Sequence, residues 1–198
     1  MSRNSTILTC KTKVQDFAVA GGKPVFDTVK PTSNLVKPNK ETFLNYLFQS
    51  KSRETEKLSS LLEDRLANFH QVKHCIVLNS GFWALAVLVK ILSKNSNPEV
   101  IIPSLTYRRL GDVVAWCDKT PVFCDVDKST LALSRETVEG NVNSQTSLII
   151  GVHPVGNHVD IDGLEAISQR QKIPLIFDSV ESVAEEHNGK VLGAFGDA

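Results

Sequence analysis

The stretch VIIPSLTYRRLGDVVAWCDKTPVFC, residues 100–124, decides the fold class of this protein. Two short apolar runs, 100–102 and 121–124, are typical of buried strands. The segment between them, after Thr106 and to about Trp116, is typical of a helix. A strand, a helix and a second strand in this order predict two parallel strands joined by a helical crossover.

The same alternation continues on both sides of this stretch. Because each predicted strand is apolar on both faces, the pattern favours a mainly parallel sheet that is covered by helices on both sides. The sequence therefore predicts an α/β protein with three α/β/α layers. The further strands are expected at 75–78, 148–152 and 173–177, and the further helices at 82–92, at about 164–171, and over a region that begins near Ser52 and reaches Phe69.

The first forty residues differ from the rest of the chain. Pro24, Pro31 and Pro38 interrupt them, with the pair Gly21-Gly22, and no helical or strand period is sustained. We expect residues 1–40 to form an extended N-terminal arm and residues 41–198 to form one large domain.

Composition and charge exclude several classes of protein. The chain has 198 residues, of which 41% are hydrophobic, and 22 Lys+Arg balance 22 Asp+Glu. A neutral chain lacks the overall positive charge that favours nucleic-acid binding. No apolar run approaches the length of a transmembrane helix, and the polar N-terminus does not resemble a signal peptide. The four cysteines show no C-x-x-C spacing, so we expect reduced thiols and a cytoplasmic protein.

Three features follow the carboxyl ends of predicted strands, where α/β sheets bind their ligands. Ser80-Gly81 opens directly into a helix, whose free N–H groups attract anions. Tyr107 places an aromatic ring at the sheet edge, and Asp178 is an acid that requires a cation if it is desolvated. Each feature also has a structural explanation as a turn, a core residue or a helix cap. Together they predict one pocket for a phosphorylated pyridine cofactor.

Five motifs, in order and with natural spacing, carry a family resemblance. They are IPSLTY (102–107), PVFCDVD (121–127), VHPVG (152–156), IPLIFD (173–178) and GKVLGAFGD (189–197). The chain resembles the DegT/DnrJ/EryC1/StrS aminotransferases, which use pyridoxal phosphate to aminate nucleotide-linked keto sugars. The resemblance runs from about Gly21 to the last residue. It implies the large domain of the fold-type-I pyridoxal-phosphate enzymes, a homodimer, an amino-acid donor, and a role in polysaccharide, lipopolysaccharide or secondary-metabolite sugar biosynthesis.

The resemblance also implies a role for individual residues. Asp178 matches the acid that pairs with the pyridine nitrogen and keeps it protonated. Tyr107 matches the aromatic residue that stacks on the ring. Glu181 stands where a Gln or His usually contacts the ring 3-oxygen. Gly81, with Phe82 and Trp83, matches the segment whose backbone holds the cofactor phosphate.

Five residues, in three parts of the sequence, depart from the family pattern. The family usually reads Ser-Gly-Thr and then a small residue, whereas Phe82 and Trp83 follow Gly81 here. The threonine hydroxyl is therefore missing, although the backbone donors remain. Arg108-Arg109 after Tyr107 is also atypical, and we expect these arginines to be solvated rather than to bind a phosphate. Glu181 brings a carboxylate toward an oxygen that is itself anionic.

The resemblance places the Schiff-base lysine downstream of the Gly-Asp-Ala motif, beyond Ala198, and no lysine of the chain stands in a matching position. The expectation is an amino-terminal half that is inactive alone, without the small C-terminal domain. Two alternatives stay open: a non-catalytic truncated homologue or partner subunit that binds cofactor or nucleotide sugar, and a pyridoxal-phosphate-dependent sugar 3-dehydratase.

Other site types are less favoured. His153, His158, Asp160 and Asp162 are ligand types for a metal, but the segment is more typical of a strand end, a turn and an Asp-capped helix. The glycine fingerprint of nicotinamide binding and the G-x-S-x-G elbow of hydrolases are missing.

Overall fold

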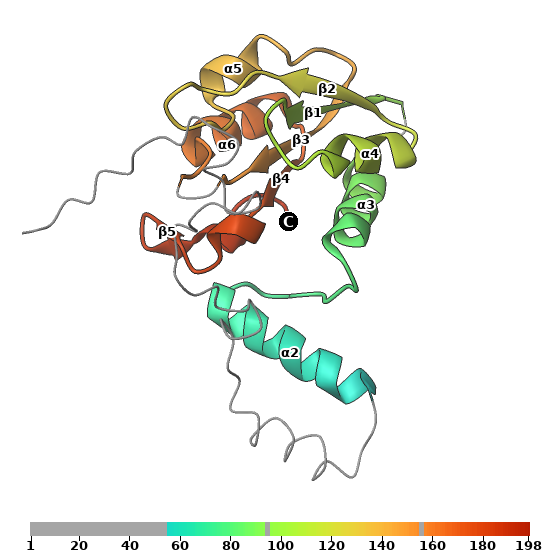
Figure 1. Cartoon of the computed structure of the whole chain (residues 1–198), viewed down its shortest axis with the longest axis vertical. Helices are drawn as coiled ribbons and strands as arrows, with labels where there is room; N and C mark the ends of the chain where they lie inside the picture. Colours follow the sequence, from blue (N-terminus) through green and yellow to red (C-terminus); the bar gives the residue numbers. More distant parts are fainter. Residues whose placement is uncertain (1–54, 94–95, 155–156) are drawn as a thin grey trace, which may run out of the picture. The chain divides into compact units, whose positions relative to one another are not determined.

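The structure, a computed structural model, describes residues 55–93, 96–154 and 157–198. Four strands form a parallel sheet in the order β2-β1-β3-β4 (Figure 1). The predicted arm, residues 1–40, lies outside the described residues and stays a prediction, as does the domain span 41–198. The strands are β1 Glu99–Pro103, β2 Thr120–Cys124, β3 Thr146–Val152 and β4 Leu175–Asp178.

Helices cover both faces of this sheet. The helix α3 (Gly81–Leu92) packs with α4 (Arg109–Trp116) on one face, and α5 (Arg135–Glu139) packs with α6 (Ile161–Gln171) on the other (Figure 1). Since neighbouring residues of a strand point to opposite faces, one strand supplies both cores. The predicted three-layer α/β/α architecture is confirmed.

The strand β1 shows how the two cores are built. Val100 and Ile102 are fully buried against α3 and α4, while Ile101 between them is fully buried on the face of α5 and α6. This alternation explains why the predicted strands are apolar at every position rather than at every second one. Burial of such a side chain stabilises the folded state by about 1.5–3 kcal/mol.

The helix boundaries follow local capping signals. Ser80 caps α3 by accepting a hydrogen bond from the Trp83 amide, and Asp160 caps α6 through the Gly163 amide at 3.0 Å. The short helix α5 is an addition to the sequence prediction, and its signal was the capping box formed by Ser134 and Thr137. The predicted helix before residue 70 is α2, Thr55–His70.

Residues 75–78 differ from the prediction, because they are not a strand. Ile76 is 77% exposed, and Leu78 is exposed as well. The amide of Val77 donates to the Glu63 carboxylate at 2.9 Å instead of to a backbone carbonyl. Among the described residues no strand lies beside this segment. An apolar composition is therefore insufficient here, since a β-strand also needs a neighbour for its backbone hydrogen bonds.

The end of β4 is fixed by backbone contacts on two sides. The His153 amide, at the end of β3, donates to the Asp178 carbonyl at 3.0 Å, and the Phe177 amide donates to the Ala198 carbonyl at 3.2 Å. Gly196 has a φ of +78°, and an added Cβ would lie 2.8 Å from the Leu175 carbonyl oxygen, so this turn requires glycine. The carboxyl end of β4 is consequently a rigid place for a functional side chain.

Two 3₁₀ turns and a small hairpin complete the described part of the chain. They are η4 (Val180–Ser182), η5 (Leu192–Ala194), and the antiparallel pair of β5 (Glu186–His187) with β6 (Lys190–Val191). The three described cysteines, Cys75, Cys117 and Cys124, are free thiols. None of the described helices is both long enough and apolar enough to cross a membrane.

Candidate active site

A cavity of about 680 Å³ opens at the carboxyl ends of β3 and β4, beside the N-terminal ends of α3 and α4. Its volume is in the range of sites that enclose a small molecule. Of the residues expected to bind a cofactor, the structure brings five to this cavity and leaves Trp83 outside. The five are Gly81, Phe82, Tyr107, Asp178 and Glu181.

The first turn of α3 offers backbone donors to the cavity. The Trp83 amide is bonded to the Ser80 hydroxyl at 3.4 Å, but the amides of Gly81 and Phe82 have no acceptor among the described residues. A Cβ added to Gly81 would meet nothing within 4 Å. Open space therefore lies beside two free N–H groups at the positive end of a helix, which is an arrangement that attracts an anion.

Asp178 lies on the wall that β4 contributes. Its side chain is half-buried, and one carboxylate oxygen accepts a hydrogen bond from the Val180 amide at 3.2 Å. None of the ion pairs among the described residues includes Asp178. A half-buried carboxylate without a cationic partner is a site where a positively charged ligand atom gains most.

Tyr107 and Glu181 are both exposed on the cavity wall. Tyr107 is 69% exposed, and Glu181 is exposed on η4. Neither side chain has a hydrogen-bond or ionic partner among the described residues. An exposed aromatic ring on a cavity wall is free to stack on a planar ligand. The lining of the cavity thus includes the N-terminal ends of two helices and two carboxylates.

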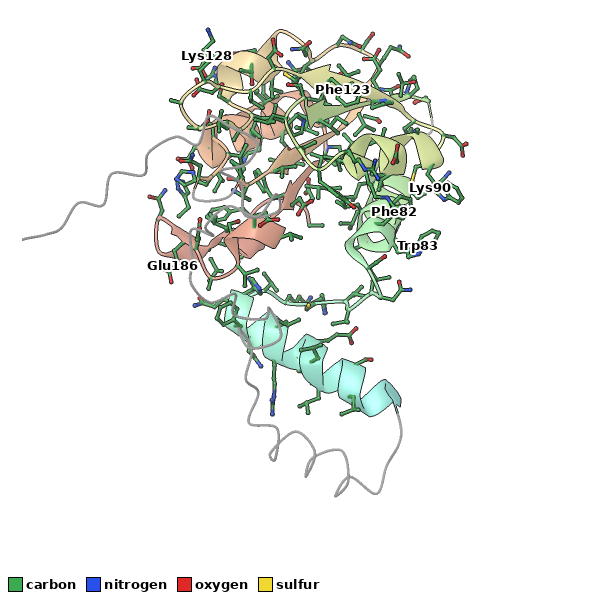
Figure 2. All side chains as sticks on the ribbon, in the orientation of Figure 1. Phe82, Trp83, Lys90, Phe123, Lys128 and Glu186 are labelled. Carbon is green, nitrogen blue, oxygen red and sulfur yellow. The ribbon has the colours of Figure 1, made fainter. Side chains whose placement is uncertain are left out.

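Trp83 does not line the cavity; its ring lies on the outer side of α3 (Figure 2). It is part of an aromatic cluster made of Phe82, Trp83 and Trp116. The ring centroids lie 5.4 Å apart for Phe82 and Trp83, and 6.3 Å apart for Trp83 and Trp116. The Trp83 amide also donates its hydrogen bond to the Ser80 hydroxyl, so a phosphate would have to compete with Ser80 for this donor.

Arg109 is a functional candidate that the sequence analysis expected to be merely solvated. The structure places it on the cavity wall, with its guanidinium carbon 5.3 Å from the centroid of the Phe82 ring. Both arginines are exposed, as expected, but Arg108 does not line the cavity. The sequence shows two adjacent positive charges at 108 and 109. The fold is needed to show that Arg109, and not Arg108, lines the cavity.

His153 also lines the cavity, although it was considered only as a possible metal ligand. The residue is fully buried, its ring packs on Phe177 with centroids 5.3 Å apart, and its Nδ1 accepts from the Val159 amide at 3.3 Å. Burial, together with the nearby His158 and His187, lowers the pKa of His153 to about 4. His153 is therefore neutral at pH 7, with Nε2 as an unpartnered donor.

Among the described residues, no group of three or more histidine, cysteine, aspartate or glutamate side chains could hold a metal ion. No described lysine lines the cavity either.

The model of the DegT/DnrJ/EryC1/StrS aminotransferase family matches residues 20–198. The chain belongs to this family. The resemblance carried by the five motifs is thereby confirmed, and the match includes the whole cavity.

Two curated proteins illustrate this likeness. The chain is 35% identical over 130 residues to an L-glutamine:2-deoxy-scyllo-inosose aminotransferase of Micromonospora echinospora, covering 66% of the chain and 31% of that protein. It is 32% identical over 135 residues to a GDP-perosamine synthase of Vibrio cholerae, covering 68% of the chain and 37% of that protein.

A solved aminotransferase from Psychrobacter cryohalolentis has the same fold, with a TM-score of 0.76 at 24% identity; the match covers 84% of the chain and 42% of that structure. The fold is therefore that of the pyridoxal-phosphate aminotransferases, as expected. The chain spans about a third of the length of the curated relatives that it matches.

Proposed function

We propose that this chain is the cofactor-binding part of a pyridoxal-phosphate-dependent aminotransferase that acts on a nucleotide-linked keto sugar. The observation that carries the proposal is that one cavity is lined both by a group that attracts a cation and by groups that attract an anion. Asp178, which lacks a cationic partner in the described structure, and the free amides of Gly81 and Phe82 all line it. A molecule with a cationic nitrogen and a phosphate fits these groups, and pyridoxal phosphate has both.

Each residue has a defined task in this proposal. Asp178 accepts a hydrogen bond from the pyridine N–H and keeps the nitrogen protonated, Tyr107 stacks on the ring face, and the amides at the start of α3 hold the phosphate. Glu181 is assigned to the ring 3-oxygen, where its carboxylate favours the protonated over the anionic form of that oxygen. When bound, the cofactor supplies an electron sink for the substrate carbon.

The substrate and partners rest on the family and on the names of the relatives. The name of the Vibrio relative contains a GDP-linked sugar, and that of the Micromonospora relative contains L-glutamine as the other reactant. We propose a nucleotide-linked keto sugar as acceptor and an amino acid as donor, in a cytoplasmic homodimer. The role proposed is in the biosynthesis of a polysaccharide, a lipopolysaccharide or a secondary-metabolite sugar.

Pyridoxamine 5′-phosphate is the probe that tests the proposal. It carries an amine in place of the aldehyde, so it cannot condense with surface lysines. We expect saturable binding of one molecule per chain in equilibrium dialysis, and a clear loss of affinity in Asp178→Asn. Absence of binding, or equal binding by Asp178→Asn, would overturn the proposal. Because no described lysine lines the cavity, binding rather than turnover is the decisive measurement for this chain.

A further inference from the structure

Two of the residues that depart from the family pattern are in contact with each other. Phe82 stands where the family usually has threonine, and Arg109 belongs to the atypical doublet after Tyr107. They are 27 positions apart in the sequence, yet the guanidinium of Arg109 lies over the Phe82 ring, 5.3 Å from its centroid. Both residues line the cavity. An arginine in this position is held by the attraction between its charge and the electron-rich face of the ring.

The Phe82 ring is itself fixed by its neighbours. Trp83 and Trp116 pack against it with centroid distances of 5.4 and 6.4 Å and steep interplanar angles of 88° and 71°. Figure 2 shows Phe82 and Trp83 side by side on α3. These two contacts restrict the orientation of the Phe82 ring, and the ring in turn positions the Arg109 guanidinium on its face.

The charge of Arg109 is not neutralised within the described structure. The ion pairs there use Lys90, Arg135 and Arg170 as cations, and His187 contacts the Asp162 carboxylate. Arg109 is also the first residue of α4, where a positive charge is opposed by the positive end of the helix dipole. Asp112 lies in the same turn but forms no ion pair with it. A guanidinium on a cavity wall that has no acidic partner in the described structure, and that lies at the positive end of a helix, favours an anionic ligand.

We propose that Arg109, positioned by Phe82, binds the phosphate group of a phosphorylated ligand in this cavity and so takes over the task of the missing threonine hydroxyl. This inference rests on the proposed function, because that function makes the cavity a phosphate site. A guanidinium forms two parallel hydrogen bonds to a phosphate, which a hydroxyl cannot do. The phosphate belongs either to the cofactor or to a nucleotide-linked substrate, and the two sources share this chemistry.

The test compares Arg109→Gln with Arg108→Gln, which removes the same charge from the neighbouring exposed residue outside the cavity. The probes are pyridoxamine 5′-phosphate, pyridoxamine without phosphate, and UDP, titrated by calorimetry on the full chain. We expect Arg109→Gln to lose about 10-fold or more in affinity for a phosphorylated probe. Affinity for pyridoxamine should not change, and Arg108→Gln should bind all probes as the unaltered chain does.

The pattern of losses identifies the source of the phosphate. A loss confined to pyridoxamine 5′-phosphate assigns Arg109 to the cofactor, and a loss confined to UDP assigns it to the nucleotide. The inference would be overturned if Arg109→Gln bound both phosphorylated probes as tightly as the unaltered chain does. It would also be overturned if Arg109→Gln lost as much affinity for pyridoxamine as for the phosphorylated probes. If the unaltered chain binds neither vitamin B6 compound, the proposed function fails, and UDP alone then decides the role of Arg109.

Phe82→Leu tests the positioning of Arg109 by the ring. It keeps an apolar side chain on α3 but removes the aromatic face. We expect a loss of phosphate affinity that is smaller than that of Arg109→Gln, with no additional loss when the two substitutions are combined. Arg109→Lys should restore part of the affinity, because it keeps the charge without the planar fork. Fully additive losses would reject the coupling between ring and guanidinium.

Discussion

The guanidinium of Arg109 lies 5.3 Å from the centre of the Phe82 ring, and this contact joins the N-terminal ends of α3 and α4 at the wall of one cavity. The free amides of Gly81 and Phe82 lie at the same end. Asp178 and Glu181 add two carboxylates to the lining of the same cavity. The cavity therefore offers groups that attract an anion and groups that attract a cation.

Asp178→Asn should weaken binding of pyridoxamine 5′-phosphate by about 10- to 100-fold, because a neutral amide cannot stabilise a protonated ring nitrogen. The fold should be unchanged, since an amide oxygen still accepts the hydrogen bond of the Val180 amide. Equilibrium dialysis gives the affinity and thermal melting monitors the fold. Asp125→Asn, an exposed aspartate outside the cavity, is the matched control. Equal losses in both variants would count against the assigned role.

Tyr107→Ala should reduce affinity for the same probe by about 1 kcal/mol, the usual contribution of an aromatic stacking contact. Tyr107 is largely exposed, so the melting temperature should hardly change. Tyr107→Phe keeps the ring and should retain the affinity, which a titration of both variants will show. If the alanine variant binds as tightly as the phenylalanine variant, the ring does not stack on the ligand.

Gly81→Ala separates ligand binding from folding. An added Cβ meets no protein atom within 4 Å, so the melting temperature should stay the same or rise slightly, because alanine favours a helix over glycine. The methyl group would keep a phosphate away from the amides, and we expect about tenfold weaker binding, or ~1.4 kcal/mol. Gly140→Ala, at another open glycine, is the control. Undiminished binding in Gly81→Ala would place the phosphate elsewhere.

The buried His153 should make folding sensitive to acid. Its pKa is lowered to about 4 in the folded chain, whereas an unfolded chain has an ordinary histidine pKa near 6.5. Between these values the unfolded state binds the additional proton, so the free energy of unfolding falls as the pH is lowered through this window. The total loss from this group is about 3 kcal/mol.

Urea unfolding at pH 7 and pH 5 measures this effect. His153→Gln should show a smaller decrease in stability between the two pH values than the unaltered chain. His74→Gln, at an exposed histidine, should follow the unaltered chain. A decrease of the same size in all three proteins would show that other groups dominate the acid response.

Much of the fold could be predicted from particular residues. The continuous apolar runs around Ile101, Ile149 and Ile176 predicted the central strands, because strands buried on both faces cannot carry polar side chains. Residues 75–78 have the same composition and are not a strand, because pairing depends on a neighbour rather than on the segment itself. Five of the six expected site residues line one cavity, because they follow strand ends or open a helix, and such places lie at one edge of a parallel sheet.

Apolar runs, capping residues and motifs are local in the chain, and they were sufficient to predict the family, the layered fold and five of the residues that line the cavity. The folded chain was needed to show that Trp83 faces away from the cavity, that His153 is buried on its wall, and that Arg109 rather than Arg108 lies over Phe82. Those outcomes depend on how α3 packs against α4 and on which side of each element a residue falls. Contacts between distant segments arise from packing, which no local pattern encodes.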